Sequence, residues 1–378
     1  MTPPLTTTPA SDNTVAPGVD ARLTQLVEDF VTRRRVHHVV AAIATGDGKL
    51  RWSAACAPAE GPPLSRSPFF IASVTKRFII TLVLQAHERG ELDLSAPIAD
   101  YLPAETIAGL HVLGGVDRTH TITVRHLASH TSGLPDYFEK RRQGPSLYEN
   151  LRAGRDQAWS FDDVLRIVRE QQRPHFVPQN LAATRQKGRY SDTGFQLLIR
   201  IVEAVTGRSF ADLLAERITT PLGLTRTWLP SHPQSTTDTT ALCPLHSGQR
   251  QVELPLTIES SKDLVSTTGD LLTFHRALLA GEVFEHARSV EILTERRNRL
   301  RNIPILRYGL GTMIFNVGRL MSAGRRPLTL VGHSGVTGTW LFHCPELDLH
   351  LTGTVDDTHG QALPFRLMAQ MLHSWRSR

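Results

Sequence analysis

A serine and a lysine three positions apart, Ser73 and Lys76, are the pair in this chain whose types and spacing best support chemistry. On a helix such positions share one face, which places the hydroxyl beside the amine. Serine attacks a carbonyl only when a base takes its proton, and desolvation lowers the pKa of a lysine enough for that task. An N-capping serine followed by a surface lysine is the ordinary alternative. The stretch from 73 to 89 is too apolar to give Lys76 an easy solvent face, so the sequence favours Ser73 as a nucleophile.

A polar turn at 188–192 carries a second set of reactive side chains, Tyr190 and Asp192, into another predicted helix. A tyrosine there can relay a proton between nucleophile and leaving group if a nearby cation lowers its pKa. Two ordinary alternatives stay open, a half-buried tyrosine with a hydrogen-bonded hydroxyl and an aspartate that caps the helix. We predict a catalytic Tyr190, and for Asp192 either substrate binding or capping.

Glycine-rich backbone follows a predicted strand at 330–338, where His333, Ser334 and Gly335 precede Val336. Glycine lets the chain approach a ligand closely and leaves a backbone N–H free to bind an oxyanion. His333 can offer a hydrogen bond or a positive charge to a substrate carbonyl or carboxylate. The chain has 17 histidines, so any one of them is an ordinary residue by default. We predict that His333, Ser334 and Gly335 contact the substrate.

Hydrophobic periodicity predicts the elements that hold these residues. Helices are expected over 20–35, 73–89, 161–171, 194–205, 268–279 and 362–375. Short apolar runs between turn residues predict strands over 38–44, 50–57, 308–317, 328–332, 339–344 and 347–355. Strands at both ends of the chain with helices between them imply one sheet built from distant segments. The predicted fold class is α/β (α+β), an antiparallel sheet flanked by helices plus a mainly helical lobe.

The same pattern predicts the domain organisation. Residues 1–19 are rich in Thr, Pro and Ala, and we expect a disordered N-terminal tail. Residues 20–378 are expected to form one domain. Its sheet lobe is expected from about 20–72 and 301–378, and its helical lobe from about 73–300, with the active site in the cleft between the lobes.

The three motifs occur in a recognisable order, on a helix, a loop and a strand. Other segments match the same pattern, namely residues 90–94, 101–103, 123–135 and 221–224. Over about 36–375 the chain resembles the serine β-lactamase and penicillin-binding-protein superfamily. The resemblance is closest to its branch of class C β-lactamases, D-Ala-D-Ala carboxypeptidases and family VIII esterases.

The resemblance implies that Ser73 is acylated and that Lys76 and Tyr190 share proton transfer. It also implies an oxyanion hole made of the N–H groups of Ser73 and Val336. β-Lactamases of the superfamily have Asn in place of Asp192 and Lys, or sometimes His, in place of His333, whereas an acid and a histidine there are common among its esterase-like members. A neutral His333 would hold a substrate carboxylate less firmly than a lysine.

These implications predict a serine hydrolase that forms an acyl-enzyme from a small ester or amide, esterase-like or D-amino-acid-peptidase-like. Efficient β-lactam hydrolysis is not expected. An acyltransferase or peptide cyclase using the same acyl-Ser73 intermediate stays open.

Three other interpretations compete with this one. Residues 332–335 nearly match the nucleophile elbow of α/β-hydrolases, with Ser334 as nucleophile, but the elbow needs glycine where Val336 stands. His126 and His130 have the i, i+4 spacing of a metal-binding helix, although no glutamate follows the first histidine. The third interpretation is a non-catalytic binding scaffold, which the presence of all the expected catalytic side chains disfavours.

Composition limits the partners. Net charge is +6, which is compatible with an anionic substrate, but the 42 basic residues are scattered among 36 acidic ones, so no nucleic-acid partner is predicted. No apolar run approaches the length of a membrane span.

The three cysteines, Cys56, Cys243 and Cys344, form no CxxC pair and are expected to be buried thiols. No metal or cofactor is predicted, and no pattern specifies the oligomeric state. The start lacks a secretory signal pattern, which predicts a cytoplasmic location unless a leader was removed earlier.

Overall fold

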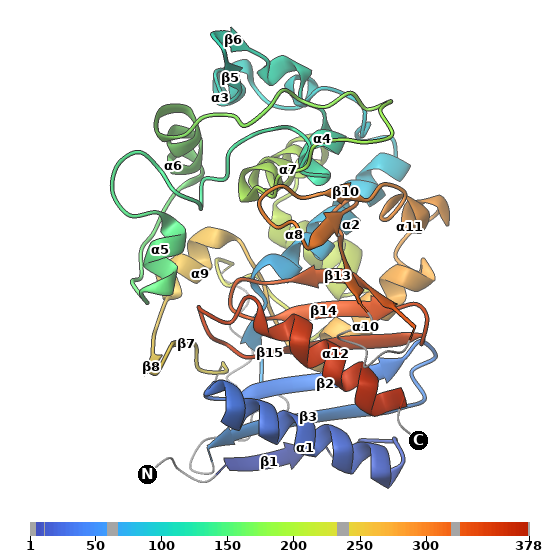
Figure 1. Cartoon of the computed structure of the whole chain (residues 1–378). Coiled ribbons are helices and arrows are strands. Elements are labelled where there is room, and N and C mark those ends of the chain that lie inside the picture. The colour runs from blue at the N-terminus through green and yellow to red at the C-terminus, as the bar shows by residue number, and fades with distance from the viewer. Residues whose placement is uncertain (1–4, 11, 59–66, 233–241, 319–325, 377–378) are drawn as a thin grey trace.

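The computed structural model describes residues 5–10, 12–58, 67–232, 242–318 and 326–376. One nine-stranded antiparallel sheet runs through the molecule in the order β1-β3-β2-β15-β14-β13-β12-β11-β10 (Figure 1). Its strands are β1 (Leu5–Pro9), β2 (Val39–Thr45), β3 (Arg51–Pro58), β10 (Asn298–Arg299), β11 (Leu306–Tyr308), β12 (Met313–Val317), β13 (Leu328–Ser334), β14 (Trp340–Cys344) and β15 (Leu349–Thr354). Because β2 pairs with β15, the two ends of the chain meet in the middle of the sheet, as the sequence predicts.

Helices cover both faces of the sheet. α1 (Pro17–Arg34) and α12 (Leu363–Arg376) pack against each other on one face (Figure 1). On the other face α10 (Thr268–Ala280) packs against β2, β14 and β15, and α2 (Lys76–Glu88) contacts β13. Alternate strand residues therefore enter two separate apolar cores, one under α1 and α12 and one shared with the rest of the helices.

The helical lobe lies beyond α2 (Figure 1). Its helices are α3 (Ala104–Ile107), α4 (Val124–Ala128), α5 (Leu147–Arg152), α6 (Phe161–Arg166), α7 (Asp192–Thr206), α8 (Phe210–Leu214), α9 (Pro255–Ser261) and α11 (Arg288–Ile292). Short 3-10 and π-helical turns adjoin them over Ile98–Asp100, Thr119–Thr121, Ile167–Gln171 and Ala215–Thr219. Three short strand pairs complete the structure, β4 (Phe69–Phe70) with β9 (Val265–Ser266), β5 (Val112–Leu113) with β6 (Val116–Asp117), and β7 (His246–Ser247) with β8 (Arg250–Gln251).

The helix predicted over 73–89 is central and buried, as expected. It begins as a 3-10 turn, Ala72–Thr75, and continues as α2, in which every residue from Lys76 to Ala86 is buried. Phe78 stacks on Phe274 of α10 with ring centroids 3.7 Å apart. Apolar contact on all sides thus fixes the orientation of the turn that carries Ser73.

The structure differs from the predicted domain organisation in two places. Leu5–Pro9 forms the edge strand β1 and pairs with β3, so the expected disorder of 1–19 is wrong for these residues. Three consecutive threonines suit an extended conformation, and the outer edge of β3 offers them hydrogen bonds. In addition, α10 and β10 fall within the predicted helical lobe, 73–300, yet belong to the sheet layers.

The remaining bulk predictions can be placed briefly. Cys56, Cys243 and Cys344 are free and buried, as predicted. Within the described ranges, no helix is both long enough and apolar enough to cross a membrane.

Candidate active site

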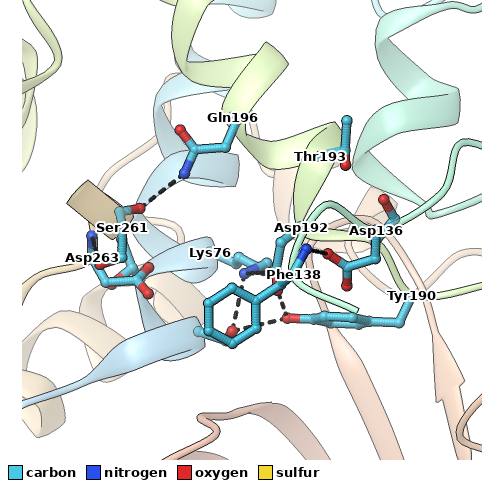
Figure 2. Close-up of polar contacts among 12 residues, drawn as sticks. Lys76, Asp136, Phe138, Tyr190, Asp192, Thr193, Gln196, Ser261 and Asp263 are labelled. Carbon is cyan, nitrogen blue, oxygen red and sulfur yellow. Dashed lines mark hydrogen bonds and ion pairs between the residues drawn. The ribbon is translucent and has the colours of Figure 1, made fainter. Parts of the chain in front are cut away.

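Ser73 lies where the predicted motifs meet. Its Oγ accepts a hydrogen bond from Lys76 Nζ at 3.0 Å and one from Tyr190 OH at 2.9 Å. Lys76 Nζ lies 2.5 Å from Asp192 Oδ1, and Tyr190 OH lies 3.3 Å from the same oxygen. Figure 2 shows Lys76, Asp192 and Tyr190 converging from α2, α7 and the loop before α7. The structure therefore brings together four side chains that are up to 119 positions apart in the sequence.

The backbone before Ser73 is strained and closely packed. Ala72 has a φ of 46°, in the left-handed region that residues with a Cβ rarely adopt. The end of β13 presses against it: a Cβ on Gly335 would lie 2.1 Å from Thr339 Oγ1 and 2.8 Å from Ala72 Cβ. Thr339 Oγ1 also donates to Ile71 O at 2.9 Å. Only glycine at 335 lets the turn after β13 approach the nucleophile this closely.

The protonation of Lys76 differs from the sequence prediction. Burial lowers the pKa of its amine, but the nearby carboxylates of Asp192 and Asp263 outweigh burial and raise the pKa above its ordinary value. Lys76 is therefore an ammonium before substrate binds, and the predicted lowering of its pKa is wrong for this state. The sequence prediction considered burial alone, whereas the ion pair with Asp192 forms only in the folded chain.

Tyr190 is held by its backbone and by its ring. Tyr190 N donates to Asn302 Oδ1 at 3.0 Å, and Asn302 Nδ2 donates back to Tyr190 O at 3.2 Å. The ring packs beside His130, with centroids 4.5 Å apart. Burial and the Asp192 charge raise the pKa of the Tyr190 phenol well above its ordinary value. The phenol is thus a neutral hydroxyl that can donate and accept.

Asp192 is not the residue that caps α7. It is the first residue of the helix, and the N-cap position is Ser191. The Asp192 carboxylate instead pairs with Lys76. The capping role is therefore wrong, the contact with Lys76 is a role that the sequence did not predict, and the predicted substrate contact of Asp192 stays a prediction.

His333 lies near the end of β13, as predicted, but its side chain points into the protein interior. Its ring is fully buried and is not among the residues that line the cavity over Ser73. His333 Nε2 accepts from Tyr308 OH at 3.0 Å, and Nδ1 donates to Ser334 O at 2.9 Å. Burial and the Lys76 charge lower its pKa well below the ordinary value, so the ring is neutral. In this structure the His333 side chain turns toward Tyr308. Its predicted contact with a substrate stays a prediction.

Two of the competing chemistries also fit the structure poorly. Ser334 Oγ contacts Met313 Sδ at 3.5 Å rather than a base, and β14 follows where an elbow needs a helix. His126 Nε2 donates to Gln179 O, and His130 Nδ1 accepts from Ser191 N at 3.3 Å. Both histidines thus make hydrogen bonds to neighbouring loops and do not share one helical face.

A cavity of about 250 Å³ opens over Ser73. Ser334 and Val336 lie on its sheet side. Its walls are largely aromatic, formed by Phe70, Tyr137, Phe138, Tyr148, Trp159, Tyr190 and Phe195. This volume suits a small substrate, and rings on several sides suit an apolar or a cationic group.

Acidic residues outnumber basic ones among the charged residues that line the cavity. Asp136, Glu139, Asp192 and Asp263 all line it, whereas Lys76 is its sole cationic lining residue among the described part of the chain. Lys76 pairs with Asp192, and Arg189 pairs with Glu139 at 2.5 Å. Asp136 and Asp263 have no ion-pair partner within 4.0 Å among the described residues.

Those two carboxyl groups have raised pKa values. Burial, with the charges of Asp192 and Glu139, raises the pKa of Asp136 well above its ordinary value. Burial raises the pKa of Asp263 to about 7, although the Lys76 charge opposes this change. Figure 2 shows Asp263 and Asp136 on opposite sides of Lys76. The cavity therefore holds one carboxyl group that titrates near neutral pH.

Sequence reasoning missed Asp136 and Asp263. Asp136 directly follows the segment 123–135, which matches the superfamily pattern. This position is the sequence feature that could have identified Asp136 as a site residue. Asp263 follows α9 in a stretch without any motif, and it reaches the cavity because Leu264 N donates to Thr75 Oγ1 at 2.9 Å beside the nucleophile.

Comparison with known proteins agrees with this geometry. The family model described as Beta-lactamase matches residues 23–371, so the chain belongs to that family. Penicillin-binding protein 4 of Amycolatopsis lactamdurans is 34% identical over 52% of this chain and 46% of its own length. Esterase EstB of Burkholderia gladioli is 29% identical over 55% of this chain and 51% of its own. The chain thus spans about half the length of these curated relatives.

A solved structure matches more completely. The D-stereospecific amidohydrolase from a Streptomyces species is 25% identical, covers 92% of this chain and 97% of its own, and superposes with a TM-score of 0.71. The predicted family resemblance and fold class are confirmed by these matches.

Proposed function

We propose that this protein is a serine hydrolase that forms an acyl-enzyme at Ser73 from a small ester or amide whose acyl part carries a protonated amine. The observation that carries the proposal is a nucleophile contacted by Lys76 and Tyr190 at the floor of a cavity, in which Asp263 has no ion-pair partner in the described part of the chain. The esterase and the amidohydrolase among the relatives support both bond types.

Attack begins with removal of the Ser73 proton. Lys76 is cationic, so the acceptor must be reached through it or through Tyr190. Asp192 Oδ1 lies within reach of both, which makes it the end of a short relay: the Ser73 proton passes to Lys76 or Tyr190 as that group passes its own proton to Asp192. When substrate closes the cavity and excludes water, the uncharged forms of Lys76 and Asp192 become more favourable relative to the ion pair. The reason is that removing two charges from water costs free energy.

The carbonyl oxygen of the substrate gains negative charge as Ser73 attacks. We assign the oxyanion hole to the N–H groups of Ser73 and Val336, the latter in the turn that Gly335 lets approach Ser73. One such donor is typically worth about 3 kcal/mol of barrier. Tyr190 then delivers a proton to the leaving amine or alcohol as Asp192 passes the proton taken from Ser73 back to the phenol. Water completes hydrolysis through the same groups: its proton passes to Asp192 as it attacks the ester, and Ser73 is reprotonated as it leaves.

Charge in the cavity argues for a cationic acyl group. A substrate carboxylate would face Asp136 and Asp263, and the neutral, buried His333 offers it no compensating charge. A substrate ammonium would pair with Asp263 and favour ionisation of that carboxyl group. The same ammonium would lower the pKa of Lys76 by repulsion, which assists proton transfer when the correct substrate is bound.

Matched substrates test this proposal. D-phenylalanine p-nitroanilide and its N-acetyl derivative differ in one charge at the amine. We expect wild-type protein to cleave the free-amine compound with a kcat/KM about 10- to 100-fold higher, as a charged hydrogen bond of about 1.5–3 kcal/mol would give. Asp263→Asn should remove this preference, and Ser73→Ala should cleave neither compound.

Two results would contradict separate parts of the proposal. If the acetylated and the free-amine compounds are cleaved with equal kcat/KM, the proposed preference for a cationic acyl group is wrong, whereas the proposed serine hydrolase activity stands. If no ester or amide is cleaved and intact-mass spectrometry finds no adduct on wild-type protein, the acyl-enzyme is wrong and the scaffold interpretation gains support.

A further inference from the structure

A second group of side chains with metal-binding chemistry lies where β14 turns into β15. His343 and His350 face each other directly across these strands in the sheet register. Asp348, in the turn between them, places Oδ1 3.3 Å from His343 Nε2. One ring nitrogen from each histidine and one carboxylate oxygen all lie within 4.8 Å of one another. Small side-chain movements would bring these three atoms to the roughly 2 Å distances of a zinc ion.

The backbone is shaped to put the carboxylate there. Asp348 adopts a φ of 48°, in the left-handed region. Its carboxylate lies against Gly46 at the end of the neighbouring strand β2, where a Cβ would come within 2.3 Å of Asp348 Oδ1. Gly46 N donates to Asp348 O at 3.0 Å. A positive φ at 348 and the absence of a side chain at 46 together hold the carboxylate beside His343.

A third histidine stands behind this group. His275 of α10 is fully buried, and its Nδ1 lies 3.3 Å from His350 Nδ1. Its other ring nitrogen, Nε2, is buried without a hydrogen-bond partner in the described residues. Metal-ligating histidines usually have a second hydrogen-bonded group that fixes the tautomer and orientation of the ring. His275 occupies that place for His350, and Figure 1 shows α10 beside β14 and β15.

The donor set points to a class of cation. Two imidazoles and one carboxylate suit zinc and the neighbouring late first-row ions, whereas magnesium and calcium prefer oxygen ligands throughout. The guanidinium of Arg276 lies nearby, with its Nε donating to Gly46 O, and opposes a cation. The carboxylates of Asp348 and Glu346, on the same turn, offset that charge.

We propose that His343, Asp348 and His350 form a binding site for a late first-row divalent cation such as Zn²⁺, with water completing its coordination. Asp348 is exposed, so the site can exchange its ion with solvent. It lies at the end of β14 opposite the turn that carries Val336, and so it is separate from the Ser73 centre. A bound ion would tie the β14–β15 turn together, and its effect is on stability rather than on acyl transfer.

The other close group of donors in the described chain is a useful contrast. His38, Cys243 and Asp356 also lie within 4.8 Å of one another, but all are buried. His38 Nε2 pairs with Asp356 Oδ2 at 3.0 Å, and Asp356 Oδ1 accepts from Thr354 Oγ1 at 2.8 Å. These donors already satisfy one another, so this group carries no proposal.

Titration of chelator-treated full-length protein with ZnCl₂, followed by calorimetry, tests the site. We expect one saturable equivalent in wild type, and a midpoint of thermal unfolding that rises with added Zn²⁺. His343→Gln and His350→Gln should each abolish both effects, while activity on the substrate of the Ser73 centre stays unchanged. Asp348→Asn should weaken binding by about tenfold or more.

Matched controls separate this site from other zinc-binding side chains. His120→Gln alters an exposed histidine outside the proposed site, and Cys243→Ala alters the buried group of His38, Cys243 and Asp356. Both variants should bind Zn²⁺ as wild type does. The proposal is overturned if wild type shows no saturable binding, if His343→Gln binds normally, or if Cys243→Ala removes the bound equivalent. Circular dichroism confirms that each variant is folded before its titration is interpreted.

Discussion

The Lys76 ammonium and the Asp192 carboxylate form a partly buried ion pair 2.5 Å apart, and the same ammonium donates to the hydroxyl of the nucleophile. Burial lowers the lysine pKa, but the Asp192 carboxylate and the nearby Asp263 together outweigh burial and keep Lys76 protonated before substrate arrives. An acid at 192 therefore changes what Lys76 can do: it moves the end of the proton relay from the lysine to the aspartate. Substitutions at Asp192 and Tyr190 separate these roles.

Asp192→Asn tests whether the relay ends at the carboxylate. Asparagine keeps the size of the side chain but cannot accept the proton, so we expect kcat/KM to fall by about 10²- to 10⁴-fold across the pH range. Steady-state kinetics with the D-phenylalanine p-nitroanilide substrate measure this, with Asp100→Asn on the surface as the control. If Lys76 alone is the base, the variant would instead remain active and its acid limb would move to lower pH, because the lysine pKa would fall.

Tyr190→Phe tests the second contact to Ser73. Removing the hydroxyl deletes the 2.9 Å hydrogen bond and the proton donor to the leaving group, and we expect a loss of about 10²- to 10⁴-fold in kcat. The effect should be larger for anilides than for p-nitrophenyl esters, whose leaving group needs no proton. Tyr148→Phe, which changes another hydroxyl of the cavity wall, should be close to wild type. Equal losses for both leaving groups would contradict the assignment of Tyr190 as the acid.

Gly335→Ala tests the close approach of the turn after β13 to the nucleophile. The new Cβ would lie 2.1 Å from Thr339 Oγ1 and 2.9 Å from Ile71 O, so the turn has to move away from Ala72 and Ser73. We expect loss of most activity, by about 10²-fold or more if one oxyanion donor is displaced, together with a lower unfolding midpoint. Gly318→Ala is the control, since no atom lies within 4 Å of its added Cβ. Normal kinetics for Gly335→Ala would argue against Val336 as an oxyanion donor.

Much of this site could be predicted from the sequence because its motifs are local. The spacing of Ser73 and Lys76 predicts that they share one face of a helix, and the polar turn is a local pattern that marks Tyr190. The structure brings all three side chains together. The strands of the sheet were predictable for the same reason, since each is a short apolar run between turn residues.

What could not be predicted depends on contacts between distant segments. His333 is turned away from the cavity by Tyr308, 25 positions earlier, and Asp263 lies in a stretch without a motif. The net charge of +6 is compatible with an anionic substrate, yet four acidic residues and one lysine are the charged residues among those that line the cavity in the described part of the chain. Overall charge is a sum over the surface and carries no information about a buried site.

Asp263 should reduce the stability of the protein at neutral and alkaline pH. Its pKa is about 7 in the folded chain against an ordinary 3.8, so the folded state retains a proton that the unfolded state has lost. Stability therefore falls as pH rises from about 4 to 7, and the loss is complete above 7. Since the side chain is partly exposed, we expect Asp263→Asn to gain only about 2 kcal/mol in the free energy of unfolding at pH 8. Urea denaturation at pH 8 and pH 4 measures the difference, and an equal effect at both would contradict the raised pKa.

The same carboxyl group should control how activity on cationic substrates depends on pH. Only ionised Asp263 attracts an ammonium, and its pKa in the free enzyme is about 7, so kcat/KM for the free-amine anilide should rise between about pH 6 and 8. The N-acetyl anilide carries no charge, and its kcat/KM should lack this rise. In Asp263→Asn the two substrates should give parallel profiles, because the group that distinguishes them is gone. If the rise persists in Asp263→Asn, it belongs to deprotonation of the substrate amine or of another enzyme group, and Asp263 does not select the cation.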